Sequence, residues 1–174
     1  AGFVEELAQE NGAVVVALEH RFYGKSQPFD TLATDNLRYL STAQALLDAV
    51  SFQHFYNEQL RRMGGSGAGP WYVFGGSYAG ALAAWLRAFF AEQFASAVAS
   101  SAVVHLELDF RKFDEQVAVS CGQQCASLLA RTYAAIDALL AEPSENARVK
   151  ARFSADSLND GDFRYLLADA GSMA

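Results

Sequence analysis

A strand-like run leads directly into a turn of small residues and then into a helix-like run. The run Trp71-Tyr72-Val73-Phe74 is aromatic and β-branched, which is typical of a buried strand. The turn that follows is Gly75-Gly76-Ser77-Tyr78-Ala79-Gly80, and the segment after it is rich in alanine and leucine, which favours a helix. The sequence therefore predicts a strand and a helix that pack closely on either side of a tight turn.

Ser77 lies at the centre of this turn, with Gly75 two positions before it and Ala79 two positions after it. This is the pattern of a nucleophile elbow, G-x-S-x-A here, as found in α/β-hydrolases. In such an elbow a strained backbone position lifts the serine hydroxyl above the edge of a parallel sheet. The alternative is a plain strand-to-helix turn in which Ser77 is only the helix N-cap. The turn by itself leaves both interpretations open.

Length and composition favour a globular protein without a nucleic-acid or membrane partner. The 174 residues are 52% hydrophobic and 19% charged, which suits one unit with a sizeable core. A net charge of −7 disfavours binding to nucleic acid. Glu, Arg or Gln interrupts every apolar stretch before it reaches membrane-spanning length. The chain begins at Ala1 without Met or a signal sequence, so we expect it to start inside a domain.

Helical and strand-like segments alternate in the first part of the chain. We expect helices at residues 3–9 and from Ser41 or Thr42 to about Met63, and strands at 13–18, 71–74 and 95–104. This order is typical of an α/β fold with a doubly wound parallel sheet, in which catalytic groups gather at the carboxyl ends of the strands. Both Ser77 and the segment 19–21 follow such ends.

The second part of the chain has helical spacing without strand signals. We expect helices at 110–140, 147–153 and 163–167, with a break at Pro143. The sequence therefore predicts a partial α/β-hydrolase core over residues 1–108 and the start of a helical cap or lid insertion over residues 109–174. The alternative is a single long α/β domain.

Four co-linear segments resemble one family of serine peptidases. They are Glu19-His20-Arg21-Phe22-Tyr23-Gly24-Lys25-Ser26-Gln27-Pro28-Phe29, residues 36–46, residues 75–80 and Ala99-Ser100-Ser101-Ala102. The chain resembles the serine carboxypeptidase family of lysosomal Pro-X carboxypeptidase, dipeptidyl-peptidase II and thymus-specific serine protease. The resemblance is strong over residues 3–110, and it continues more weakly to the end of the chain through residues 162–169.

The resemblance implies a serine exopeptidase of the Pro-X carboxypeptidase or dipeptidyl-peptidase type. Such an enzyme would need no cofactor or metal. It would act on peptides with proline next to the cleaved bond, in a lysosome or vacuole or after secretion. The alternatives are a non-catalytic α/β-hydrolase-like binding protein and an esterase on the same fold.

Carried onto this chain, the resemblance implies that Ser77 is the acylating nucleophile and that the backbone N–H of Tyr78 is an oxyanion donor. The aspartate and histidine of the triad are expected beyond Ala174, and a glycine-rich oxyanion loop is expected before Ala1. The chain is therefore expected to be a fragment that does not hydrolyse peptides when made alone, because a serine hydroxyl needs a neighbouring base.

The three histidines are considered as local substitutes for that base. His105 follows the strand after the elbow and would need to come within hydrogen-bonding reach of Ser77. His54 lies within a helix, where packing or surface exposure is the simpler explanation. For Glu19, His20 and Arg21 we favour a loop-bracing role near the site, with an ion pair between Glu19 and Arg21, over direct contact with substrate.

Cys121 and Cys125 are four residues apart on a presumed helix, and no downstream pair supplies zinc-ligand spacing. In a regular helix their Cβ atoms would lie roughly 5–6 Å apart, whereas a relaxed disulfide needs about 3.5–4.5 Å. The resemblance implies a cysteine near Cys125 that pairs elsewhere in the cap, but no partner occurs around Asp156. A bridge to a segment outside the chain, a strained local bridge and two free thiols remain open.

Overall fold

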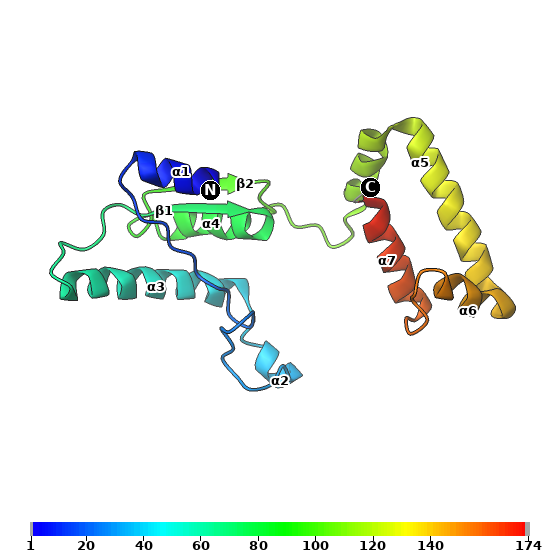
Figure 1. Cartoon of the computed structure of the whole chain (residues 1–174), viewed down its shortest axis with the longest axis horizontal. Coiled ribbons are helices and arrows are strands. Elements are labelled where there is room, and N and C mark those ends of the chain that lie inside the picture. The colour runs from blue at the N-terminus through cyan, green and yellow to red at the C-terminus, as the bar shows by residue number, and fades with distance from the viewer. Residues whose placement is uncertain (1, 173–174) are drawn as a thin grey trace. The chain divides into compact units, whose positions relative to one another are not determined.

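The computed structural model describes residues 2–172 of the chain. The chain divides into two compact units, with the boundary between Leu106 and Glu107 (Figure 1). Among these residues the first unit contains both strands, and the regular elements of the second unit are all helices. No helix within residues 2–172 is long and apolar enough to cross a membrane.

The first unit is an α/β arrangement around a small parallel sheet. Its elements in chain order are α1 (Phe3–Glu10), α2 (Thr34–Leu37), α3 (Thr42–Arg62), β1 (Tyr72–Gly76), α4 (Ser77–Phe89) and β2 (Ser96–Ser100). The strands β1 and β2 pair in parallel, with Tyr72 opposite Ser96 and Gly76 opposite Ser100. Helix α4 is the crossover between them and lies along the sheet (Figure 1). The α/β class predicted from the sequence is confirmed.

Helix α3 packs against α4 through the core of this unit. Leu46 of α3, Leu86 of α4 and Phe94 form a buried cluster, with partly buried apolar side chains such as Trp71 around it. The Trp71 indole N–H donates to Asn57 Oδ1 of α3 at 3.1 Å, which ties the start of β1 to this helix. Of the two residues at which the sequence allows this helix to begin, Ser41 or Thr42, Ser41 is the N-cap of α3, and its hydroxyl accepts from the Gln44 backbone N–H at 3.3 Å.

The strand predicted at residues 13–18 is absent from the structure, so that prediction is wrong. Within residues 2–172 the sheet has two strands, and residues 13–20 form no regular secondary structure. Val14 is 75% exposed. A parallel strand exists only beside a hydrogen-bonded neighbour, and in the described part of the chain β1 and β2 pair only with each other.

The strand predicted at 95–104 is shorter than expected. It ends at Ser100 because Ser101, at φ 47°, enters the left-handed region and turns the chain away from the sheet.

The second unit consists of α5 (Arg111–Ala141), α6 (Pro143–Ala151) and α7 (Asp160–Ser172). Helix α5 is broken at Gly122, whose φ of 81° and ψ of 158° are not helical. Helix α6 starts at Pro143, four residues before the predicted start, because proline suits the first position of a helix. The helical character predicted for this part of the chain is confirmed.

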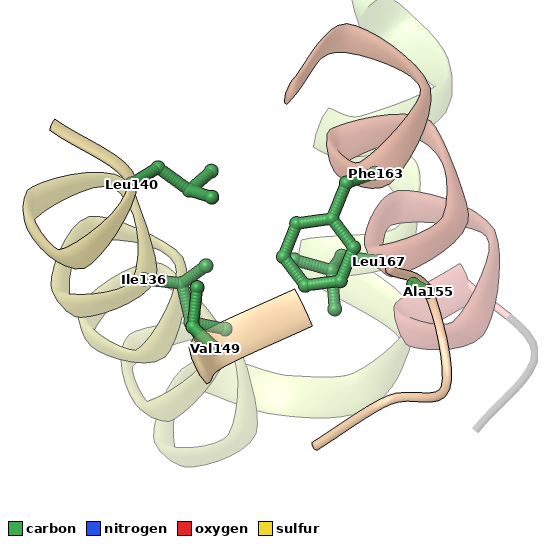
Figure 2. Close-up of a cluster of buried hydrophobic side chains, with 6 residues drawn as sticks. All are labelled: Ile136, Leu140, Val149, Ala155, Phe163 and Leu167. Atoms are coloured by element: carbon green, nitrogen blue, oxygen red, sulfur yellow. The ribbon is translucent and has the colours of Figure 1, made fainter. Parts of the chain in front are cut away.

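The core of the second unit lies between these three helices and the connection before α7 (Figure 2). Its buried side chains are Ile136, Leu140, Val149, Ala155, Phe163 and Leu167. The ring of Phe163 is fully buried at the centre. Beside this cluster, the buried Lys150 amine pairs with Asp160 Oδ1 at 2.6 Å. Hydrogen bonds from Lys150 and then Asn146 lower the pKa of Asp160 and keep it ionised.

Replacing Phe163 with alanine should destabilise the second unit by about 3–5 kcal/mol, because the change leaves a cavity at the centre of its core. The free energy of unfolding is measured in denaturant for the wild type and the variant. The matched control is Tyr165→Ala on the same helix, whose side chain is 76% exposed. We expect the control to change stability by no more than about 0.5 kcal/mol. Equal losses in the two variants would contradict this description of the core.

Candidate active site

The junction between β1 and α4 places Ser77 in a strained backbone conformation. Strand β1 ends at Gly76, and Ser77 is the first residue of α4. The φ of Ser77 is 56°, in the left-handed region that residues other than glycine rarely adopt. Such a conformation costs about 1–3 kcal/mol and persists only where the surroundings enforce it. The tight strand-to-helix turn predicted from the sequence is thus present, with its strain at the serine.

Close contact between backbones explains the glycines around Ser77. A Cβ atom on Gly75 would lie 2.1 Å from the carbonyl oxygen of Ala79, well inside van der Waals contact. A Cβ atom on Gly80 would lie 2.9 Å from the carbonyl oxygen of Ser100 in β2. Helix α4 therefore begins directly against both strands, and a side chain at Gly75 would push strand and helix apart.

Tyr78 presents two groups of interest at this junction. Its backbone N–H lies in the first turn of α4, where amides have no partner inside the helix and can bind an anionic oxygen. Its side-chain hydroxyl lies 3.2 Å from His20 Nε2 and 3.4 Å from Thr42 Oγ1 at the start of α3. The amide is predicted from the sequence, whereas the role of the hydroxyl and of Thr42 is not. Separations of 36 and 58 residues leave no local pattern that would reveal these contacts.

Arg21 fastens the loop after residue 18 to helix α3. Its guanidinium binds Asp48 through two parallel contacts, Nε to Oδ2 at 2.5 Å and Nη2 to Oδ1 at 2.6 Å. It also donates to the Tyr39 carbonyl oxygen at 2.9 Å and to Gln44 Oε1. The hydrogen bond with Asp48 raises the pKa of Arg21, so the pair remains charged. The ion pair predicted between Glu19 and Arg21 is therefore wrong, and the partner of Arg21 is Asp48.

Glu19 instead closes the loop on itself. Its Oε2 accepts hydrogen bonds from the backbone N–H groups of Lys25 at 2.9 Å and Ser26 at 2.8 Å. These bonds, those from Ser26 foremost, lower the pKa of Glu19. The expected pair does not form, because the Glu19 carboxylate binds backbone amides of its own loop and the Arg21 guanidinium binds Asp48.

The other two histidines and the two cysteines considered in the sequence lie at exposed positions. His54 is exposed on α3, and His105 lies at an exposed position beyond β2. Cys121 and Cys125 are exposed free thiols in the structure, on either side of the break at Gly122. Among residues 2–172, no group of three or more His, Cys, Asp or Glu side chains is placed to hold a metal ion.

The contact at Gly75 predicts a clear difference between two neighbouring glycines. Gly75→Ala should lower the free energy of unfolding by about 1–3 kcal/mol, because the new methyl group overlaps the Ala79 carbonyl. Gly76→Ala is the control, since a Cβ atom there meets nothing within 4 Å and its φ of −116° suits alanine. Denaturant unfolding measures both variants. A tolerated Gly75→Ala would show that strand and helix are not pressed together.

The Arg21–Asp48 pair predicts coupling in a double-mutant cycle of Arg21→Ala and Asp48→Ala. We expect a coupling energy of about 1–2 kcal/mol, because the contact is two-pronged and the side chains are 21% and 39% exposed. The control cycle uses the single-contact pair Arg62–Glu58 on α3, with side chains 66% and 56% exposed, where about 0.5 kcal/mol or less is expected. Additive losses at Arg21 and Asp48 would rule out this bracing contact.

Comparison with known proteins identifies the family. The model of the family described as serine carboxypeptidase S28 matches residues 1–167. The chain is 45% identical over 177 residues to "Probable serine protease EDA2" of Arabidopsis thaliana, covering 99% of this chain and 36% of that protein. It is 37% identical over 163 residues to the thymus-specific serine protease of Mus musculus, covering 89% of this chain and 31% of that protein. A third relative, "Prolyl carboxy peptidase like protein 5" of Caenorhabditis elegans, is 46% identical over 107 residues, which cover 59% of this chain and 20% of that protein.

The chain thus spans about a third of the length of the first two relatives. The matched region includes the strained turn at Ser77 and the loop braced by Arg21. By the extent of this match, the chain belongs to the serine carboxypeptidase S28 family.

Proposed function

We propose that this chain carries the nucleophile elbow of a serine-type exopeptidase and that Ser77 is the acylating nucleophile. The observation that carries the proposal is the φ of 56° at Ser77, at the junction of β1 and α4. A left-handed serine between a parallel strand and a helix is the geometry that exposes a nucleophilic hydroxyl at a sheet edge. Membership of a serine peptidase family supports this role.

The reaction follows from two groups at the junction. The Ser77 hydroxyl oxygen attacks the carbonyl carbon of the peptide bond, and its proton passes to a base. The backbone N–H of Tyr78 donates to the oxygen that becomes negatively charged in the tetrahedral intermediate. The leaving amine takes the proton and departs, and water then hydrolyses the ester formed on Ser77.

We assign the base and its orienting carboxylate to parts of the protein outside these 174 residues. The nearby imidazole, that of His20, uses both ring nitrogens in contacts with the Arg21 carbonyl and the Tyr78 hydroxyl. A general base needs a free nitrogen directed at the serine hydroxyl. On this assignment the 174 residues made alone turn over no peptide, although they carry the nucleophile.

The architecture of the whole enzyme is proposed on the same basis. The parallel unit β1–α4–β2 would form part of an α/β-hydrolase core, and the helices α5, α6 and α7 would begin a cap. Glu19, His20 and Arg21 would brace a loop beside the nucleophile, with Asp48 as the anchor on α3. Two of these three side chains make their contacts within the loop or with α3, which supports bracing over direct binding of substrate.

For the substrate we propose peptides with proline next to the cleaved bond. One relative bears the name prolyl carboxypeptidase-like, and others are named serine proteases. A Pro-X carboxypeptidase or a dipeptidyl-peptidase would fit both names. We further propose a lysosomal, vacuolar or secreted location, and a mechanism that uses no cofactor.

Ser77→Ala in the full-length protein that carries this sequence should abolish turnover of proline-containing peptides. Loss of a nucleophile of this kind lowers kcat by about 10⁶-fold. Covalent labelling by a fluorophosphonate probe should disappear as well, while thermal unfolding shows an intact fold.

The control for Ser77→Ala is Ser154→Ala, since Ser154 in the second unit has a similar φ of 55°. This control should retain both labelling and turnover. Residual turnover of more than about one hundredth of the wild-type rate in Ser77→Ala would overturn the assignment.

A further inference from the structure

We propose that His20 is a positioning residue for catalysis: with Thr42 it holds the Tyr78 side chain and thereby fixes the amide that binds the oxyanion. The proposal rests on the proposed function of Ser77 and Tyr78. Its basis is that three separate segments come together at the Tyr78 hydroxyl. His20 belongs to the loop after residue 18, Thr42 begins α3, and Tyr78 lies in the first turn of α4.

The contacts of His20 define its tautomer. His20 Nδ1 lies 2.8 Å from the carbonyl oxygen of Arg21, and a carbonyl can only accept, so Nδ1 carries the proton. In the neutral ring Nε2 is then an acceptor. The Tyr78 hydroxyl, 3.2 Å away, therefore donates to Nε2 and is left to accept from the Thr42 hydroxyl at 3.4 Å. Proton donation runs in one direction, from Thr42 through Tyr78 to His20.

The imidazole is itself held in place. Its ring meets the Tyr23 ring edge-on, with centroids 5.3 Å apart and planes at 82°. The Tyr78 ring is tilted by 55° to the imidazole, with the ring centroids 5.7 Å apart. The neighbouring residue Arg21 is anchored to Asp48 on α3. His20 therefore presents a fixed acceptor, and a fixed acceptor can restrict the Tyr78 side chain.

Restricting the Tyr78 side chain matters because Tyr78 directly follows the strained residue Ser77. Ser77 occupies a backbone conformation that persists only where surrounding contacts enforce it. Tyr78 is the next residue, and its N–H belongs to the peptide unit that joins the two. Holding the Tyr78 side chain at two points limits rotation of that peptide unit. The amide is then oriented before substrate binds, which is the condition for stabilising a charge that develops only in the transition state.

This role differs in its kinetic effect from direct catalysis or substrate binding. Complete loss of one oxyanion donor lowers kcat by about 10²–10³-fold. A donor that remains but is less well oriented should cost less, about tenfold in kcat. Because the interaction is made in the transition state, KM should change by no more than about twofold.

The test uses Tyr78→Phe, His20→Ala and the double variant in the full-length protein. Each single variant should lower kcat about tenfold, and the double variant should lose no more than either single one, because both remove the same contact. His20→Gln should recover part of the rate, since an amide oxygen can accept from the tyrosine hydroxyl. Active sites are counted with a fluorophosphonate probe, so kcat refers to folded enzyme. Tyr72→Phe, with an exposed side chain in β1, is the control and should leave kcat unchanged.

The proposal would be overturned by additive losses in the double variant, by a change in KM with kcat intact, or by loss of thermal stability with kcat intact. Tyr78→Phe keeps both the ring and the backbone and removes only the hydroxyl. It therefore tests the contact with His20 even where His20→Ala does not fold. Activity that survives in Ser77→Ala would instead overturn the proposed function. Activity that is lost in Ser77→Ala but unaffected in Tyr78→Phe would overturn the positioning role alone.

Discussion

The close approach of helix α4 to the two parallel strands is the constraint on which the first unit depends. A side chain at Gly75 would overlap the Ala79 carbonyl in the helix start, and a side chain at Gly80 would press on the Ser100 carbonyl in β2. With strand and helix so close, the connecting residue has no room for an ordinary extended-to-helical transition, and the strain falls on Ser77. The reactive position in this proposal is thus a direct result of packing.

Helix α3 organises what surrounds that position. From its first residue to its last turns it supplies Thr42 to the Tyr78 hydroxyl, Asp48 to Arg21 and Asn57 to Trp71. Its buried face, with Leu46, packs against α4. One helix therefore supports both the strand that leads to Ser77 and the loop that faces it. A rigid element is better suited to this task than a loop, because its side chains keep fixed relative positions.

Local sequence signals predicted the local parts of this arrangement well. The bounds of α3, beginning at Ser41 or Thr42, and the strand–turn–helix around Ser77 each follow from a few adjacent residues. The strand predicted at 13–18 is wrong for a non-local reason. Apolar side chains make the run resemble a buried strand, but a strand forms only where a neighbouring strand pairs with it. The contacts of Arg21 with Asp48 and of Tyr78 with Thr42 join residues 27 and 36 positions apart, and no periodicity encodes such pairs.

The break in α5 at Gly122 changes how the two cysteines are related. Its φ of 81° and ψ of 158° belong to a region that is essentially restricted to glycine, so α5 consists of two helical segments (rods) joined at a kink. Cys121 ends one rod and Cys125 lies on the other. The regular pitch that would hold their Cβ atoms roughly 5–6 Å apart does not apply across such a joint. The backbone conformation of Gly122 therefore contributes to the spacing of the two thiols.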